Sequence, residues 1–183
     1  MNAGMIAISV DQLKGLRTRH PIEPDQSWVP EVVRKEGWQV ANARYLEGER
    51  QRYADAMRDL LSVLGIGGPR DADEALDLIE LAFEVFAPDE GFAGVLRRRP
   101  GGELYLRNAH CPTYALMEAQ GRLGVTACAS WHRRRGWLDA LNVDATDSML
   151  SDRLWGSRAC SALLCVRAVK PPLLLPVGAA AAA

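Results

Sequence analysis

The sequence has almost no net charge, no long apolar run and no pair of cysteines in C-x-x-C spacing. A formal net charge of -1 and a pI near 6.3 give no general attraction for nucleic acid or an anionic membrane. No stretch approaches the roughly 20 apolar residues that span a bilayer. The short apolar run at the amino terminus lacks the features of an export signal. We therefore expect a cytoplasmic protein with no nucleic-acid or membrane partner.

The composition is that of an ordinary globular protein. With 183 residues, of which 48% are hydrophobic and 25% charged, the chain can bury one sizeable core. We expect a single α+β domain over residues 27–169, preceded by an irregular segment at 1–26 and followed by a Pro- and Ala-rich tail at 170–183. Four cysteines could pair outside the cell, but in the cytoplasm they are expected to be reduced.

The first half of the chain has helical periodicity. Apolar residues at helical spacing predict a helix over residues 39–64, and the glycine-rich run that follows ends it. A second helix begins at Asp71, whose side chain can cap the first turn, and Glu74 three residues later resembles a capping box. Pro88 lies just beyond its end.

The second half has shorter, β-prone runs. Those at 92–96 and 103–107 flank a glycine-containing turn and predict one hairpin. Runs at 148–155 and 160–168 on either side of Gly156 predict another. Between the hairpins the sequence predicts helices, at about 112–120 and 127–141. The predicted fold class is α+β, with a helical N-terminal half packed against an antiparallel sheet of two hairpins with intervening helices.

Two cysteines are placed by the predicted helices between the hairpins. Cys111 directly precedes Pro112, which fits the first position of a helix. At this N-cap, free backbone N–H groups and the helix dipole favour a thiolate, so Cys111 is the best candidate for a reactive or ligating residue. Cys128 and His132 are four residues apart on a predicted helix, so both would project from one face and could bind a common centre.

The other two cysteines are placed by the last predicted strand. Cys160 and Cys165 are an odd number of residues apart, so they should point to opposite faces of the sheet. Cys160, next to the turn, is the better site candidate. Cys165 is flanked by Leu164 and Val166 and is expected to fill the core.

Each of these features also has a structural interpretation. A cysteine at helical or strand spacing is most often a small core residue, and His132 could be an ordinary exposed helix residue. The arginine triplets at 97–99 and 133–135 could bind nucleic acid or phosphate, but such runs are usually solvated surface. The tryptophans are expected to be structural, although Trp131 and Trp155 could wall a ligand pocket.

Taken together, the cysteines resemble a known arrangement. The segment 108–116 with its Cys-Pro pair, Cys128 one predicted helix later, and Gly156 four residues before Cys160 are similar to the L-2-amino-thiazoline-4-carboxylic acid hydrolase-like family. A similar order occurs in Cys-rich domains of iron-sulfur-sensing repressors and in 4-vinyl reductase-like domains. The resemblance covers about residues 91–168 and implies a site of Cys111, Cys128 and Cys160.

The resemblance implies an enzyme that acts on a small heterocyclic or sulfur-containing substrate, with hydrolase or lyase-like chemistry at a C=N bond. Three thiolates can hold zinc or an iron-sulfur cluster, with His132 as a proton shuttle. An arginine from one of the triplets could bind a substrate carboxylate. Without a metal, Cys111 itself would attack, with His110 or His132 as base.

Two further hypotheses stay open. One is a sensing or binding module whose cluster or ligand occupancy changes its affinity for a partner. The other is a cofactor-free interaction domain in which all four cysteines are structural. Homo-oligomerisation is compatible with each of them.

Overall fold

The computed structural model describes residues 8–21, 27–86, 93–123 and 125–171. In chain order its elements are α1 Val10–Arg19, α2 Val29–Glu36, α3 Trp38–Leu64, α4 Ala72–Phe86, β1 Ala93–Arg98, β2 Glu103–His110, α5 Pro112–Ala119, α6 Ser130–Leu141, β3 Val143–Ser151, the 3-10 turn η1 Arg153–Trp155 and β4 Cys160–Val169. The α+β class predicted from sequence is confirmed. The Pro- and Ala-rich tail from residue 172 lies outside the described residues.

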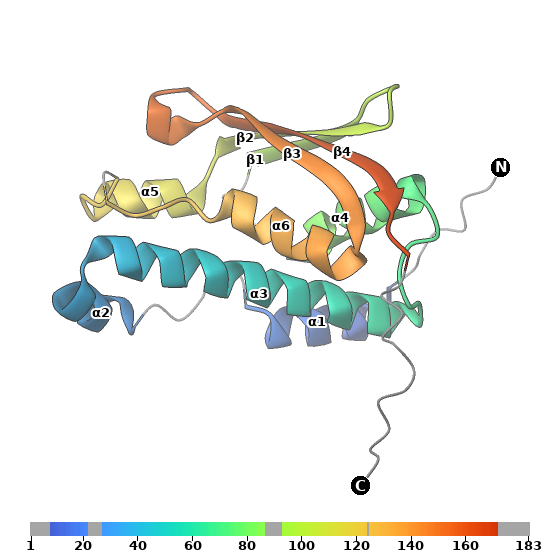
Figure 1. Ribbon diagram of the computed structural model, residues 1–183, viewed down its shortest axis with the longest axis horizontal. Coiled ribbons are helices and arrows are strands. Elements are labelled where there is room, and N and C mark those ends of the chain that lie inside the picture. Colours follow the sequence, from blue (N-terminus) through green and yellow to red (C-terminus); the bar gives the residue numbers. More distant parts are fainter. Residues whose placement is uncertain (1–7, 22–26, 87–92, 124, 172–183) are drawn as a thin grey trace, which may run out of the picture.

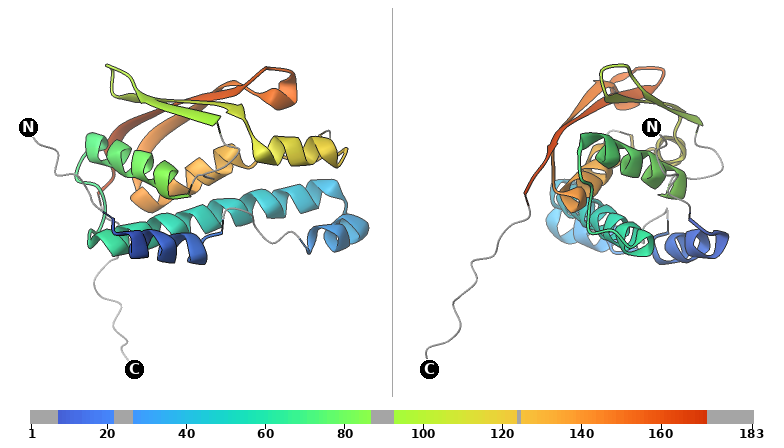
Figure 2. Two further views of the ribbon diagram at one scale, coloured as in Figure 1. Left: turned by 180° about the vertical axis from the view of Figure 1, so that it is seen from behind. Right: turned by 90° about the vertical axis from the view of Figure 1, so that its right-hand side faces the viewer.

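The elements form three layers. The sheet lies on one side, α4, α5 and α6 lie beneath it, and the long helix α3 with α1 and α2 forms the third layer (Figure 1). Turned views show the described helices on the same side of the sheet (Figure 2). One face of each strand therefore packs inward on the helices.

The described strands form one antiparallel sheet in the order β1-β2-β4-β3. Both predicted hairpins are confirmed, although β3 begins at Val143 rather than at Ser148. The glycines of the two connections have the positive φ that these turns need, 76° at Gly102 and 88° at Gly156. Pairing of β2 with β4, which sets Asn108 opposite Cys160, joins the hairpins into one sheet.

Helices α3 and α4 begin and end close to their predicted bounds. Gly65 ends α3 in the left-handed conformation, with φ of 69°. Asp71 caps α4 as expected, because its Oδ1 accepts a hydrogen bond from the backbone N–H of Glu74 at 2.8 Å. The Glu74 carboxylate reaches the N–H of Arg70 instead of completing the capping box on Asp71.

One apolar core joins the layers. Its most deeply buried members come from α1, α3, α4, the sheet and α6; they include Leu16, Met57, Leu60, Leu76, Leu78, Ile79, Leu104, Leu141 and Leu164. Burying each such side chain contributes about 1.5–3 kcal/mol relative to leaving it exposed. Leu104 is buried between two partly exposed strand neighbours, Glu103 and Tyr105, so its face of β2 points to the helices.

Helix α1 corrects the prediction that residues 1–26 are irregular. Ser9 and Gln12 form a capping box: the Ser9 Oγ accepts from the Gln12 N–H at 3.2 Å and the Gln12 Oε1 accepts from the Ser9 N–H at 2.9 Å. Leu16 is fully buried in the core. The helix is stabilised by this cap and by tertiary packing rather than by a strong apolar stripe of its own.

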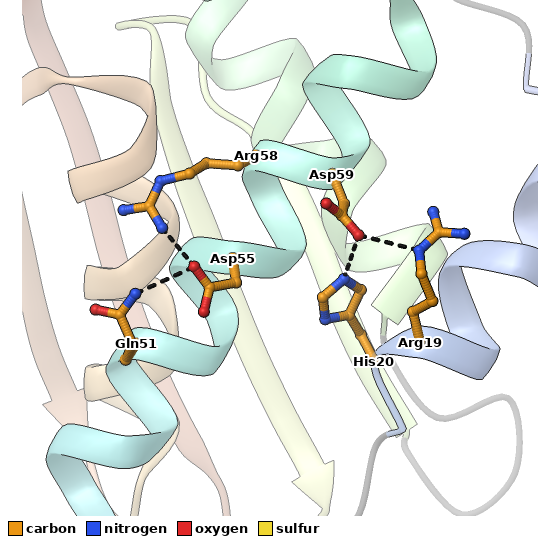
Figure 3. A network of polar contacts seen from close by, with 6 residues as sticks. All are labelled: Arg19, His20, Gln51, Asp55, Arg58 and Asp59. Carbon is orange, nitrogen blue, oxygen red and sulfur yellow. Dashed lines mark hydrogen bonds and ion pairs between the residues drawn. The ribbon is translucent and has the colours of Figure 1, made fainter.

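Polar contacts hold the end of α1 on its neighbours. The Nε of Arg19 and the Nε2 of His20 both lie beside Oδ2 of Asp59 on α3, at 3.0 and 2.9 Å (Figure 3). The Nε of Arg17 donates to the carbonyl of Val85 on α4 at 2.9 Å. Asp59 thus links two side chains at the end of α1 to helix α3.

The start of α6 is a second correction. The helix begins at Ser130 and not at about residue 127, so Cys128 precedes it. The side chain of Asn42 on α3 accepts from the N–H of Ala127 at 3.1 Å and donates to the carbonyl of Val125 at 2.6 Å. These bonds hold the preceding segment in an extended path along α3.

Across the part of the chain that the structure describes, no helix combines the length and the apolar character needed to cross a membrane.

Candidate functional site

The three cysteines predicted to form a site come from three boundaries between elements. Cys111 lies between β2 and α5, Cys128 lies two residues before α6, and Cys160 is the first residue of β4. Each is free and partly buried. Helix α5, the start of α6 and the connection from β3 to β4 lie toward the same end of the molecule (Figure 1).

Cys160 is in contact with the turn before it. Its Sγ accepts from the backbone N–H of Arg153 at 3.4 Å and lies 3.8 Å from Oδ1 of Asp152, to which it donates. Burial raises the pKa of the Cys160 thiol, the Arg153 N–H lowers it, and the charges of Asp152, Cys128 and Cys111 raise it further. Cys111 and Cys128 therefore lie within electrostatic reach of Cys160.

Cys111 occupies the N-cap of α5, as predicted. Its Sγ accepts from the N–H of Tyr114 at 3.4 Å, and its carbonyl accepts from the N–H of Ala115 at 3.0 Å. The sulfur thus occupies the position at which a serine or aspartate oxygen usually caps a helix.

Cys128 lies between α6 and the third layer. Its Sγ donates to Oγ of Ser130 at 3.3 Å. Burial raises the pKa of Tyr45 on α3, and Cys128 is one of the groups whose charge raises it further. The charge of Cys128 therefore acts on both Tyr45 and Cys160.

Cys165 is separated from this group by the sheet. The inward residues of β4 are Ala162, Leu164 and Val166, all buried, so Cys165 lies on the outer face. The predicted opposition of Cys160 and Cys165 is confirmed, but the prediction that Cys165 fills the core is wrong. Odd residues of β4 face away from the helices, and Cys165 is paired with exposed Thr146.

Among the described residues, the thiols of Cys111, Cys128 and Cys160 have hydrogen bonds to groups other than the two histidines considered as bases. Because Cys128 precedes α6, the predicted shared helix face with His132 is wrong. Burial lowers the pKa of His132, and the charges that act on it belong to Arg50 and Glu47 of α3. Its Nδ1 is buried with no hydrogen-bond partner among the residues the structure describes. His110 is exposed at the end of β2.

The arginines of the triplets mostly bind the protein's own carboxylates. The Nε of Arg133 lies 2.5 Å from Oε2 of buried Glu49, and Arg134 forms two bonds to Asp147, at 2.7 and 3.1 Å. The expectation of solvated surface is therefore wrong for these two. In the other triplet, Arg98 lies 2.6 Å from Oδ1 of Asp77. A substrate carboxylate would have to compete with these partners.

The two tryptophans near the cysteines are exposed. Trp155 is 83% exposed and Trp131 is 40% exposed. The indole N–H of Trp131 donates to the carbonyl of Asp147 at 3.4 Å. Both rings are thus on the surface.

Sequence reasoning missed the residues that surround Cys160. Asp152 caps η1 by accepting from the N–H of Leu154 at 2.8 Å. The guanidinium of Arg153 stacks 4.1 Å from the centre of the Tyr114 ring and donates to the carbonyl of Ala109 at 3.5 Å. Asp152 before a glycine-ended turn was a local signal for the cap, whereas the stacking on Tyr114 had no signal in the sequence.

The three thiols are suitable ligands for a soft metal, but their arrangement does not match a metal site. Thiolates are the ligands that zinc and iron-sulfur clusters prefer, and thiolates sharing one zinc lie roughly 4 Å apart given bonds of about 2.3 Å. In the ranges described, no three His, Cys, Asp or Glu side chains are grouped so that they could hold a metal ion. Binding of either centre would require the three sulfurs to move closer together.

A small hollow lies elsewhere, between α1, α3 and α4. It has essentially no room even for a water molecule and is lined by His20, Arg52, Tyr53, Ala56 and Phe86. Ligand pockets usually enclose about 300–1,000 Å³. The hollow is therefore too small to replace the cysteine cluster as the candidate site.

Comparison with known proteins identifies no family. No family model matches the sequence, and no curated protein matches it. Among solved structures, an H-NOX protein from S. oneidensis in the Fe(II)NO ligation state is similar at a TM-score of 0.40 and 14% identity, over 86% of this chain and 89% of that chain. A likeness at this level carries no inference about activity or cofactor.

Proposed function

We propose that this protein is a small-molecule-binding module that senses a thiophilic ligand through Cys111, Cys128 and Cys160. The observation that carries the proposal is a set of contacts that joins two of these thiols: Sγ of Cys160 accepts from the N–H of Arg153, whose guanidinium stacks on the ring of Tyr114. The N–H of Tyr114 in turn donates to Sγ of Cys111. The charge of Cys128 is among those that raise the pKa of Cys160. Because these thiols come from three separate segments, a ligand that engages all of them would join α5, α6 and the sheet. Such a ligand could change the shape of this end of the molecule.

The surroundings of the thiols favour binding over thiol catalysis. A catalytic thiol needs a base within hydrogen-bond reach. The charges that act on His132 come from α3, and His110 is exposed. The raised pKa keeps Cys160 protonated near neutral pH, which makes it a weak nucleophile but leaves it able to bind a soft metal that displaces its proton.

The chemistry of three thiols defines the ligand class. Zinc, an iron-sulfur cluster and a small electrophile each bind sulfur in preference to oxygen. Each would displace thiol protons, and a metal cation would offset the repulsion that then arises between Asp152 and the Cys160 thiolate. We keep zinc and the iron-sulfur cluster as the two metal candidates, and both need the sulfurs to approach.

The test is titration of the anaerobically purified, full-length protein with Cd²⁺, a soft ion with strong thiolate-to-metal absorbance. We expect one ion per chain and a loss of affinity in Cys111→Ser, Cys128→Ser and Cys160→Ser. The matched control is Cys165→Ser, on the outer face of the sheet, which should bind like the unaltered protein. Equal affinity in all four variants would overturn the proposal.

A second candidate is the hydrolase-like enzyme that the sequence resembles. The position of Cys111 favours it, since its sulfur is partly exposed at the start of α5 and accepts a hydrogen bond from the N–H of Tyr114. This candidate predicts that the unaltered protein opens a thiazoline-type ring and that Cys111→Ala abolishes turnover. Absence of turnover in a protein that binds Cd²⁺ would favour the sensing module.

A further inference from the structure

A continuous set of contacts connects two of the three thiols. From Cys160, the Sγ accepts the backbone N–H of Arg153 at 3.4 Å. The guanidinium of Arg153 stacks 4.1 Å from the Tyr114 ring centre, and the Tyr114 N–H donates to Sγ of Cys111 at 3.4 Å. Arg153 and Tyr114 therefore join the sulfurs of residues that are far apart in sequence.

A second contact strengthens this connection. Nη1 of Arg153 donates to the carbonyl of Ala109 at 3.5 Å, two residues before Cys111. Arg153 thus contacts both the end of β2 and the first turn of α5. Its own backbone is fixed by η1, in which the N–H of Gly156 donates to the Arg153 carbonyl at 3.0 Å.

We propose that Arg153 is the positioning residue of the thiol cluster. Its backbone orients Cys160, and its planar side chain holds the α5 turn that carries Cys111, so one residue sets the separation of the two sulfurs. The inference rests on the proposed function. This role depends on stacking rather than on an ion pair, because the guanidinium of Arg153 lies over the ring of Tyr114. Arginine stacks on an aromatic ring better than lysine does.

Phenylarsine oxide tests this role because one arsenic binds two neighbouring thiols. Two As–S bonds form, two S–H bonds break, the oxygen leaves as water and arsenic stays trivalent. The full-length protein with Cys128→Ser and Cys165→Ser retains Cys111 and Cys160 as its two thiols. In this background, Arg153→Ala and Arg153→Lys should weaken arsenical binding about tenfold, because the effective concentration of one thiol at the other falls.

Matched variants separate positioning from general stability. Tyr114→Phe keeps the ring and should bind like the background protein, whereas Tyr114→Ala should be weakened like Arg153→Ala. Arg158→Ala, at an exposed arginine of the same connection, should have no effect. Alkylation by iodoacetamide needs only one thiol, so its rate shows whether a variant merely makes a thiol more accessible. The expected signature is a loss of arsenical affinity larger than any change in alkylation rate.

Two results would overturn the inference. One is arsenical affinity that Arg153→Ala leaves unchanged. The other is a background protein whose two thiols never share one arsenic, which would show that Cys111 and Cys160 are too far apart. Neither result decides the proposed function, since the Cd²⁺ titration of the protein with all its cysteines measures that separately.

Discussion

Gly136 of α6 lies directly against the backbone of Arg50 on α3. A Cβ at Gly136 would stand 2.1 Å from the Arg50 carbonyl oxygen and 2.9 Å from the amide nitrogen of Ala54. Since backbone atoms cannot move aside as a flexible side chain does, the two helices reach this separation because residue 136 has no side chain. The contact fixes α6, and with it the segment that carries Cys128, on the third layer.

Replacing this glycine should therefore be costly. We expect Gly136→Ala to destabilise the fold by about 3 kcal/mol or more, at the upper end of overpacking effects, or to prevent folding. Urea unfolding measures the change. Gly48→Ala is the control, because Gly48 is an exposed position of α3 where an added Cβ would meet nothing within 4 Å. This substitution should stabilise the fold by about 0.5–1 kcal/mol. Similar effects from both substitutions would contradict the contact.

Glu49 is a second position at which a substitution should strongly destabilise the fold. Its carboxylate is 2% exposed and binds both Arg52 and Arg133. Glu49→Gln removes the counter-charge beside the partly buried guanidinium of Arg133 and one partner of Arg52, which should cost about 3–5 kcal/mol. Glu47→Gln, at a 69% exposed side chain on the same helix, should change the free energy of unfolding by less than about 1 kcal/mol. A small effect at Glu49 would show that the arginines find other partners.

Acid should weaken the attachment of α1. The hydrogen bond from His20, and after it the bond from Arg19, lower the pKa of Asp59. A lowered carboxyl pKa contributes stability above the unfolded value of about 3.9, and this contribution is lost as pH falls through the native pKa. Unfolding midpoints measured from neutral to acid pH should fall less steeply in Asp59→Asn.

The control for this experiment is Asp55→Asn. Asp55 bonds to Gln51 and Arg58 of its own helix, so its removal leaves α1 attached (Figure 3). It should retain the acid dependence that Asp59→Asn loses. An unchanged slope in Asp59→Asn would mean that Asp59 does not join α1 to α3.

Alkaline pH should act through Cys160. Its raised pKa favours the protonated thiol in the native state, so the stability it contributes is present below the ordinary thiol value of about 8.5 and is lost as pH rises through the native pKa. Cys160→Ser does not titrate in this range and should show a shallower alkaline decline of the unfolding midpoint. Cys165→Ser should keep the decline of the unaltered protein; if both variants lost it equally, Cys160 would not be the group responsible.

Elements with strong local signals were predicted well. The bounds of α3 and α4 follow from apolar periodicity with a glycine stop and an aspartate cap, and both hairpins follow from glycines that supply positive φ. The N-cap position of Cys111 followed from Pro112 alone. Each of these signals is contained within a few residues, so no knowledge of distant partners was needed.

The incorrect predictions arise from contacts between residues that are far apart in the sequence. Asn42 holds the segment before Cys128 out of α6, and Glu49 buries Arg133 although the arginine triplet looks like surface. Helix α1 depends on the burial of Leu16 and on Asp59 as much as on its own cap. Each partner lies 39 or more residues away in sequence from the residue that it places.

The sequence by itself determined the helical and strand periods, the turns, and the opposition of Cys160 to Cys165, because these depend on backbone geometry over a few residues. Tertiary structure decided which strand face meets the helices, and so placed Cys165 outside and Cys160 within reach of Cys111 and Cys128. It also placed Arg153 on Tyr114. Packing of α4 and α6 against one face of the sheet buries Ala162, Leu164 and Val166 of β4, and no pattern within the strand specifies that choice.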